Sequence, residues 1–357
     1  MPKKVLVTGG SGYIGSRLVH ELLTEGNDIV HTTVRNIGNF AKTQPLMELQ
    51  KKFPDRLKIF EADLLKLESF GSAMKDCEIV YHVASPFLLP EKIVDGQNQM
   101  LVPALMGTKN VLDSVNNTPS VSRVVLTSTV GAIFGDYIDV FDMKDRILSE
   151  EYFNTSSNLE NQPYHYSKVM AEKLAWNMFE EQKRWSMVVI CPGLVLGPSL
   201  TSSSESGSLS LMEELLKGYF FYGAANLSFT IVDVRDLAIA HIRAGENTNA
   251  KGRFILAHKE MSSLLEMANA IRNVHRRPYL LPKFQVPNWA AMLVGPFFGL
   301  NRDFMKKHFG IRFLTDNKRS IDELGVNYRP AEETFVDHYT SWTDQRAKGV
   351  GSKVSSN

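Results

Sequence analysis

Short β-branched and apolar runs alternate along the chain with stretches whose apolar residues recur every three or four positions. The short runs predict buried strands, and the longer repeats predict amphipathic helices. Strands are predicted at residues 5–7, 28–34, 57–60, 78–83, 121–127, 187–191, 228–232 and 253–257, and helices at 16–25, 96–115, 164–178, 237–244 and 262–274. Strands joined through helices favour right-handed crossovers and one parallel sheet. We therefore predict an α/β protein with a Rossmann-type doubly wound sheet, whose ligands gather at the carboxyl ends of the strands.

The first predicted strand leads directly into a glycine-rich turn. Thr8-Gly-Gly-Ser-Gly-Tyr-Ile-Gly15 carries glycines at positions 9, 10, 12 and 15 and opens the first helix. Glycine permits positive φ angles, and the backbone N–H groups at a helix N-terminus attract an anion. The order of strand, turn and helix is the context that a dinucleotide-binding motif requires. The residues expected to contact the dinucleotide here are Gly9, Gly12, Tyr13, Ile14 and Gly15.

The end of the second predicted strand indicates which dinucleotide binds. Arg35 stands 20 residues after Gly15, where an NAD-selective site offers a carboxylate to the ribose hydroxyls. A guanidinium cannot accept those hydrogen bonds, but it pairs with a 2′-phosphate, so Arg35 favours NADP. A solvated loop arginine is the alternative. Lys42 is the second candidate partner of that phosphate, and Asp63 either accepts a hydrogen bond from the adenine amino group or caps the following helix.

A tyrosine and a lysine form the candidate catalytic pair. Tyr164-His-Tyr-Ser-Lys168 lies in a predicted helix, which stacks residues four apart on one face. An ammonium beside a phenol should lower the pKa of Tyr164 from about 10 toward neutral pH. Tyr164 then gives a proton to a carbonyl oxygen or takes one from an alcohol. Tyr166 competes with Tyr164, but it stands two residues before the lysine and faces elsewhere on the helix.

Two adjacent hydroxyl residues end the fifth predicted strand, at Ser128 and Thr129. A hydroxyl at this position would hydrogen-bond the substrate oxygen as charge builds on it. Adjacent strand residues point to opposite faces, so only one of the two should reach the substrate. His82, on another apolar strand, is interpreted as a packed core histidine.

In combination, these motifs resemble the extended short-chain dehydrogenase/reductase family over roughly residues 3–345. The matching motifs are Thr8 to Gly15, Asp63-Leu64, His82-Val-Ala-Ser85, Thr127-Ser-Thr129, Tyr164 to Lys168 and Cys191-Pro-Gly193. Within that family the chain looks most like the dihydroflavonol reductase, cinnamoyl-CoA reductase and methylglyoxal or aldehyde reductase branch. The motifs that favour this branch are Thr33-Val-Arg35, Asp316-Asn-Lys318, Glu323-Leu-Gly325 and Tyr328-Arg-Pro330.

The resemblance implies an NADP-dependent reductase that works through a Ser or Thr, a Tyr and a Lys. These reductases usually carry Thr-Ser-Ser with the second serine catalytic, and that position here is Thr129. Thr129 is therefore the preferred hydroxyl and Ser128 the alternative. The further cofactor contacts expected on this basis, together with Tyr164 and Lys168, are Asp63, Leu64, Val83, Ala84, Ser85, Thr127, Pro192, Gly193, Leu194 and Val195.

The alternating pattern weakens after Pro192, which divides the chain. Residues 1–192 are predicted to form the NADP-binding domain with the catalytic Tyr and Lys, and its sheet to be completed by strands near 228–257. Residues 193–345 are predicted to be mainly substrate-binding, with most aromatic residues of Pro278–Phe309 in that region's own core. The serine-rich run Ser202–Ser210 predicts a mobile flap or an inert loop, and residues 346–357 a disordered tail.

Composition narrows the partners. Forty basic and thirty-nine acidic side chains nearly cancel, which argues against nucleic acid and anionic membranes as partners. A small-molecule carbonyl substrate and a monomer or homodimer are expected. Cys77 and Cys191 lack metal-ligand spacing and are interpreted as buried thiols in a reducing compartment, with no metal. Trp289–Leu300 has about half the length of a membrane span, and no secretory signal precedes the first strand, so we expect a cytoplasmic protein.

The resulting hypothesis is NADPH-dependent reduction of an aldehyde or ketone to the alcohol, with Tyr164 as the general acid. The alternatives are a sugar-nucleotide epimerase or dehydratase, a hydroxysteroid dehydrogenase, and a non-catalytic dinucleotide-sensing protein. Epimerases of this fold generally keep NAD tightly bound, and Arg35 argues against that preference. The intact set of tyrosine, lysine and hydroxyl argues against a sensor.

Overall fold

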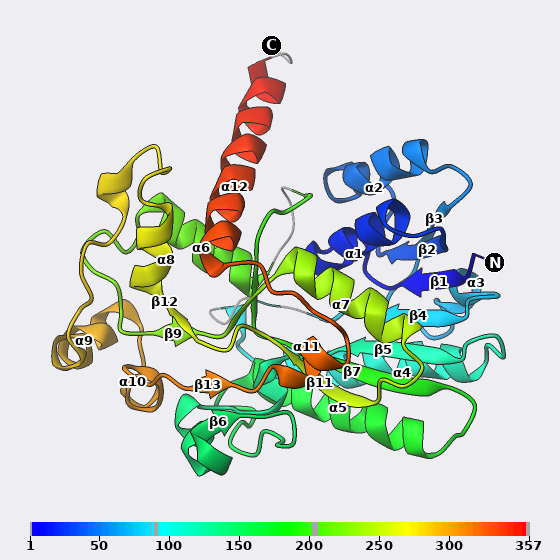
Figure 1. The fold of residues 1–357 in the computed structure, drawn as a ribbon, viewed down its shortest axis with the longest axis horizontal. Coiled ribbons are helices and arrows are strands. Elements are labelled where there is room, and N and C mark those ends of the chain that lie inside the picture. The colour runs from blue at the N-terminus through cyan, green and yellow to red at the C-terminus, as the bar shows by residue number, and fades with distance from the viewer. Residues whose placement is uncertain (1, 87, 89–91, 202–205, 355–357) are drawn as a thin grey trace.

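A seven-stranded parallel sheet forms the centre of the computed structural model, which describes residues 2–86, 88, 92–201 and 206–354 (Figure 1). Its strands are β1 (Lys4–Val7), β2 (Ile29–Val34), β3 (Leu57–Glu61), β4 (Ile79–His82), β5 (Arg123–Thr127), β7 (Ser186–Pro192) and β11 (Gly252–Leu256). They lie in the order β11-β7-β5-β4-β1-β2-β3. The direction of winding reverses between β1 and β4, which opens a crevice at their carboxyl ends. The predicted doubly wound fold is confirmed.

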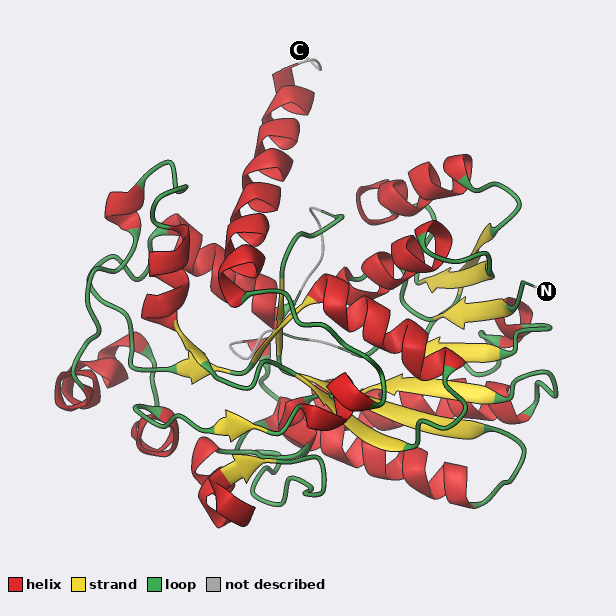
Figure 2. Ribbon diagram, viewed as in Figure 1, coloured by secondary structure: helices red, strands yellow, loops and turns green. Residues whose placement is uncertain are grey.

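Helices cover both faces of the sheet (Figure 2). The helices of the described residues, including those of the smaller lobe, are α1 (Tyr13–Thr24), α2 (Phe40–Lys52), α3 (Gly71–Met74), α4 (Val102–Asn116), α5 (Pro163–Glu180), α6 (Gly207–Lys217), α7 (Val234–Glu246), α8 (Leu264–Ile271), α9 (Asn288–Val294), α10 (Arg302–His308), α11 (Lys318–Asp322) and α12 (Ala331–Val354). Leu18 and Leu22 of α1 and Leu237 of α7 bury one face, and Leu112 of α4 and Ala175 of α5 bury the other. The cores on the two faces of the sheet hold its strands in place, and the candidate site lies at the carboxyl ends of these strands.

Short strands organise the smaller lobe. Pairs form between β8 (Leu194–Leu196) and β10 (Ile231–Asp233), between β9 (Ser228–Phe229) and β12 (Ser262–Ser263), and between β6 (Ile147–Leu148) and β13 (Leu314–Thr315). The predicted strand at 228–232 is thus split between two pairings, and only β11 of the 228–257 region joins the central sheet. The lobe packs through its own core, which includes Met212, Leu215 and Met267.

Several predicted boundaries are wrong for local reasons. The helix predicted at 96–115 is a π-helical turn over Gln97–Leu101 followed by α4, whose first turn accommodates Pro103 because that position needs no N–H. Residues 202–205 of the predicted flap lie outside the described residues, while 207–210 belong to α6. The predicted tail is helical to Val354, because α12 is anchored by buried Phe335 and Tyr339 and a formed helix extends at small cost. Residues 355–357 lie outside the described part.

Candidate active site

The glycine turn between β1 and α1 is packed too tightly for side chains. Gly9 has φ +74°, and a Cβ on Gly10 would lie 2.0 Å from Thr32 Oγ1. A Cβ on Gly15 would lie 2.2 Å from the Gly9 carbonyl oxygen. Glycine at these positions therefore lets the turn fold back on β2 and on itself, which leaves backbone rather than side chains facing a ligand.

The N-terminus of α1 is open to an anion. Gly12 is its N-cap, and among the described residues no side-chain acceptor is bonded to the N–H groups of the first turn. The Tyr13 hydroxyl donates to the Gly197 carbonyl oxygen at 2.8 Å, and Ile14 packs against the core. The side chain of Tyr13 is therefore held inside the protein, while that of Ile14 is partly buried.

Thr8 joins the glycine turn to the loop after β4. Its Oγ1 accepts from Val83 N at 3.1 Å and from Ala84 N at 3.0 Å. The same oxygen lies 3.1 Å from Nδ1 of buried His82. Burial lowers the pKa of His82 to about 3, so the imidazole is neutral. The predicted core histidine is confirmed, and the hydroxyl of Thr8 explains why a threonine opens the motif.

The other end of the crevice holds the residues predicted near the adenosine. Arg35 follows β2 and is exposed, and among the described residues it makes no ion pair. Lys42 is half-buried in the first turn of α2. Asp63 Oδ1 accepts from Leu65 N at 2.9 Å, so the capping alternative is present, although it caps a turn and not a helix. The Leu64 carbonyl accepts from Asn110 Nδ2 at 2.7 Å, which fixes this loop against α4.

Lys168 connects three of the predicted segments. It lies on α5, and its Nζ donates to the Thr127 carbonyl oxygen at 3.0 Å and to Ser85 Oγ at 3.5 Å. The Thr127 hydroxyl instead pairs with His241 Nε2 at 2.8 Å, so Thr127 serves this site through its backbone. Burial lowers the pKa of Lys168 to about 8, against the opposing charge of Glu172.

The predicted effect of Lys168 on Tyr164 is wrong for the protein alone. Burial raises the pKa of Tyr164 to about 12 instead of lowering it. Burial removes the phenolate from water, which penalises its charge and causes the shift, while the ammonium of Lys168 donates to Thr127 and Ser85. At neutral pH the phenol therefore keeps its proton, which is the form that can donate to a carbonyl oxygen.

The two candidate hydroxyls have different surroundings, as adjacent strand positions predict. Ser128 is buried, and its Oγ donates to Glu172 Oε2 at 2.5 Å. Thr129 is half-buried; its Oγ1 accepts from Gly131 N at 3.2 Å and donates weakly to the Pro192 carbonyl oxygen at 3.5 Å. The Ser128 hydroxyl is thus already bonded to a carboxylate. Thr129, two residues beyond the end of β5, is partly exposed and bonded only weakly to the end of β7.

A buried ion pair behind Ser128 was not predicted. Glu172 Oε1 lies 2.7 Å from Arg253 Nε and 3.2 Å from Trp176 Nε1, and Arg253 stacks on Phe153 with its Cζ 4.0 Å from the ring centroid. The only sequence signal was the position of Glu172 four residues after Lys168. Arg253 comes from β11, 81 residues away, and no local pattern indicates that pairing.

The segment after β7 bends sharply and is held from both sides. A Cβ on Gly193 would lie 2.4 Å from the Thr230 carbonyl oxygen. Leu194 and Val195, predicted beside the cofactor, lie in β8, and Pro192 ends β7. Gly197 N donates to His338 Nδ1 of α12 at 3.2 Å, and the Gly197 carbonyl accepts from Tyr13 of α1. Gly197 is therefore hydrogen-bonded to both helices.

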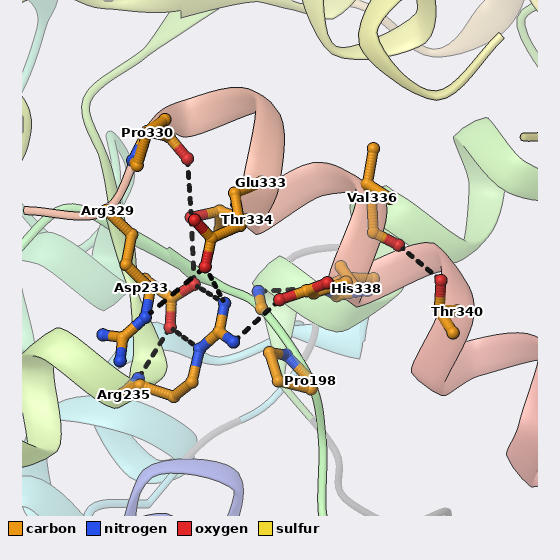
Figure 3. A network of polar contacts seen from close by, with 12 residues as sticks. Pro198, Asp233, Arg235, Arg329, Pro330, Glu333, Thr334, Val336, His338 and Thr340 are labelled. Carbon is orange, nitrogen blue, oxygen red and sulfur yellow. Dashed lines mark hydrogen bonds and ion pairs between the residues drawn. The ribbon is translucent and has the colours of Figure 1, made fainter. Parts of the chain in front are cut away.

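Asp233 connects this segment to α12 (Figure 3). Its carboxylate is fully buried, accepts from Arg235 Nε at 2.9 Å and from Thr334 Oγ1 at 2.9 Å, and caps α7. Burial raises its pKa, but the hydrogen bonds from Arg235 outweigh burial and hold the pKa of Asp233 below its usual value. Asp337 completes the cluster, 2.7 Å from Arg235. The network braces the chain around Gly197 against α7 and α12.

One small cavity of about 10 Å³ brings together residues from four segments of the chain. Its lining includes Leu64, Ser85, Ser128 and Lys168. The structure therefore gathers residues from the ends of β3, β4 and β5 and from α5 around one point at the carboxyl edge of the sheet. Cys77 and Cys191 are buried free thiols, as predicted, and Cys191 lies close enough to Lys168 to influence its pKa.

Comparison with known proteins gives consistent matches. The model of the NAD dependent epimerase/dehydratase family matches residues 5–257. Cinnamoyl-CoA reductase CAD2 of Medicago truncatula is 35% identical over 344 residues, which cover 96% of each chain. Tetraketide alpha-pyrone reductase 1 of Arabidopsis thaliana is 32% identical over 348 residues, again 96% of each chain.

A solved structure shares the whole architecture. The yeast methylglyoxal/isovaleraldehyde reductase Gre2 complexed with NADPH superposes with a TM-score of 0.77 at 25% identity, covering 96% of this chain and 99% of the other. Both the sheet and the smaller lobe are therefore common to the two proteins.

Proposed function

This chain belongs to the NAD dependent epimerase/dehydratase family and is similar to its reductases, and we propose that it uses NADPH to reduce an aldehyde or ketone to the alcohol. The resemblance to the reductase branch of the extended short-chain dehydrogenases is thus confirmed. One observation carries the assignment: Lys168 is tied to the end of β5, beside Thr129, on the helix that also holds Tyr164.

The crevice fits NADPH. The glycine turn offers backbone without side chains, and the uncapped N-terminus of α1 suits the pyrophosphate. Arg35 and Lys42 stand at the end that would receive the 2′-phosphate. The Gre2 structure that this chain resembles is a complex with NADPH, which favours the same cofactor here.

The chain's own residues then position and protonate the substrate. NADPH, when bound, supplies a hydride. Thr129 is proposed to hold the carbonyl oxygen, because the hydroxyl of Ser128 is occupied by Glu172. Tyr164 is proposed to donate its proton to that oxygen, and Lys168 supplies positive charge near the developing phenolate. The raised pKa of Tyr164 keeps the proton available throughout the neutral range.

A screen of NADPH consumption tests the proposal. The purified chain is mixed with small aldehydes, diketones and bulky aromatic ketones, and oxidation of NADPH is followed together with formation of the alcohol. We expect turnover with at least one of these classes and a preference for NADPH over NADH. Stoichiometric NADPH binding with no alcohol from any class would instead favour the sensing protein.

Arg35 should determine the preference for NADPH. In Arg35→Ala we expect kcat/KM for NADPH to fall about tenfold to a hundredfold, because a charge-assisted bond to the 2′-phosphate is lost. The value for NADH should change little, since NADH lacks that phosphate. Lys51→Gln, which removes an exposed charge at the far end of α2, is the matched control and should behave as the original chain. An equal loss with both cofactors would contradict the assignment.

The choice between Thr129 and Ser128 can be tested by paired substitutions. Thr129→Val should lower kcat about a hundredfold through loss of one donor to the substrate oxygen, while Thr129→Ser should keep most activity. Ser128→Ala should lower the free energy of unfolding, because Glu172 loses a partner, and should change kcat less than Thr129→Val does. The reverse order of kcat losses would transfer the role to Ser128.

A further inference from the structure

The outer end of the smaller lobe exposes large apolar side chains. Residues 272–309, which include α9 and α10, form the end of the molecule farthest from β1, β2 and β3 (Figure 1). The sequence predicts that most aromatic residues here form the lobe's own core. In the structure Trp289 is 74% exposed, Leu293 61% and Phe297 88%. The prediction is therefore wrong for Trp289 and Phe297.

The division of α9 into two faces explains the exposure. Ala291 is buried with Met305 and Phe309 in a small core between α9 and α10. Trp289 and Leu293 are four residues apart and share the opposite face. Tyr279 and Phe284, 65% and 55% exposed, lie earlier along the same end. Several large apolar side chains exposed on one segment are typical of a contact surface.

The same end is strongly basic, although the whole chain is nearly neutral. Residues 272–309 contain seven arginines and lysines and one acidic residue, Asp303. Five of the basic residues are exposed and make no ion pair with the described part of the chain, namely Arg276, Arg277, Lys283, Arg302 and Lys306. The argument from net charge that excluded anionic membranes therefore does not hold for this surface, because a local excess of charge sets the local field.

We propose that this basic and aromatic end, residues 272–309, binds the surface of an anionic lipid bilayer. Trp289, Leu293 and Phe297 would enter the interface between headgroups and acyl chains, where aromatic side chains are favoured. The exposed arginines and lysines of residues 272–309 would meet lipid phosphates and carboxylates. The binding is peripheral, since no helix among the described residues has the length and apolar content that a membrane crossing needs.

Charge also decides against a second copy as the occupant. A symmetric dimer through this end would place two surfaces with the same basic excess against each other. Like charges brought together at an interface repel, whereas an anionic bilayer attracts both the charges and the apolar side chains. The lipid surface is therefore the occupant that matches both properties.

Vesicle binding by the full chain tests the proposal. The protein is sedimented with vesicles of phosphatidylcholine alone and with vesicles in which phosphatidylserine replaces part of it, at low and high salt. We expect binding to the phosphatidylserine vesicles that weakens with salt. Trp289→Ala with Phe297→Ala should abolish measurable binding, and Lys283→Gln with Lys306→Gln should weaken it about 25-fold, since each basic residue contributes about fivefold.

Matched controls at the opposite end of the molecule separate this surface from general stickiness. Leu67→Ala removes an equally exposed apolar side chain, and Lys51→Gln with Lys52→Gln removes two exposed charges from α2. Both should bind vesicles like the original chain, and all variants should keep their carbonyl reductase activity in solution. No binding to phosphatidylserine vesicles, or equal losses in the controls, would overturn the proposal. Light scattering that shows a dimer abolished only by Trp289→Ala with Phe297→Ala would assign the surface to a second copy instead.

Discussion

Tyr164→Phe is expected to lower kcat for carbonyl reduction about a thousandfold. The substitution removes only the hydroxyl, so the ring keeps its packing beside His165 while the proton donor to the substrate oxygen is lost. Affinity for NADPH should stay within about twofold, because a donor that acts in the transition state contributes little to binding the cofactor. Single-turnover NADPH oxidation and a fluorescence titration measure the two quantities separately.

The pH dependence provides a control on the same residue. Alcohol oxidation needs the phenolate, and burial raises the pKa of Tyr164 to about 12, so the oxidation rate of the original chain should increase with pH through the alkaline range. Reduction needs the phenol and should show no such increase. Tyr164→Phe should abolish the increase, and Tyr166→Phe should leave it in place. A Tyr164→Phe variant with normal kcat would remove Tyr164 from the mechanism.

The parts of the fold that could be predicted are those set by local pattern. The seven strands of the central sheet follow from apolar runs, and the parallel order follows from their helical connections. The glycine turn was predictable because a side chain would clash at these positions, which restricts the sequence there to glycine. The close approach of Gly15 to the Gly9 carbonyl oxygen is an example. The placement of Tyr164 and Lys168 on one helix was predictable because the apolar residues that follow them recur at helical spacing.

The features that escaped prediction depend on residues far apart in the chain. The partners of Asp233 on α12 lie about a hundred residues away, and the partner of Glu172 lies 81 residues away. The pKa of Tyr164 was mispredicted for a related reason. The sequence shows that Lys168 stands four residues after Tyr164. Only the structure shows that the ammonium of Lys168 donates to the Thr127 carbonyl oxygen and that burial sets the pKa of Tyr164.

The buried Glu172–Arg253 pair is expected to dominate the stability of the site. Glu172→Met should lower the free energy of unfolding by about 3–5 kcal/mol, because it leaves the Arg253 guanidinium buried without its carboxylate. Ser128 and Trp176 also lose their acceptor. Such a loss is a large part of the roughly 5–15 kcal/mol that folded domains possess. Urea unfolding with an unchanged slope measures it.

The double variant distinguishes a broken charge pair from a packing defect. Arg253→Met alone leaves Glu172 charged and unpaired, but Glu172→Met with Arg253→Met removes both charges and fills the space with apolar groups of similar length. The two losses should therefore be less than additive, with a coupling of about 2 kcal/mol or more. Additive losses would mean that the pair contributes no specific interaction. In that case the hydrogen bonds from Arg253 to the Glu150 and Ala132 carbonyl oxygens, and not its charge, would explain why Arg253 is buried on β11.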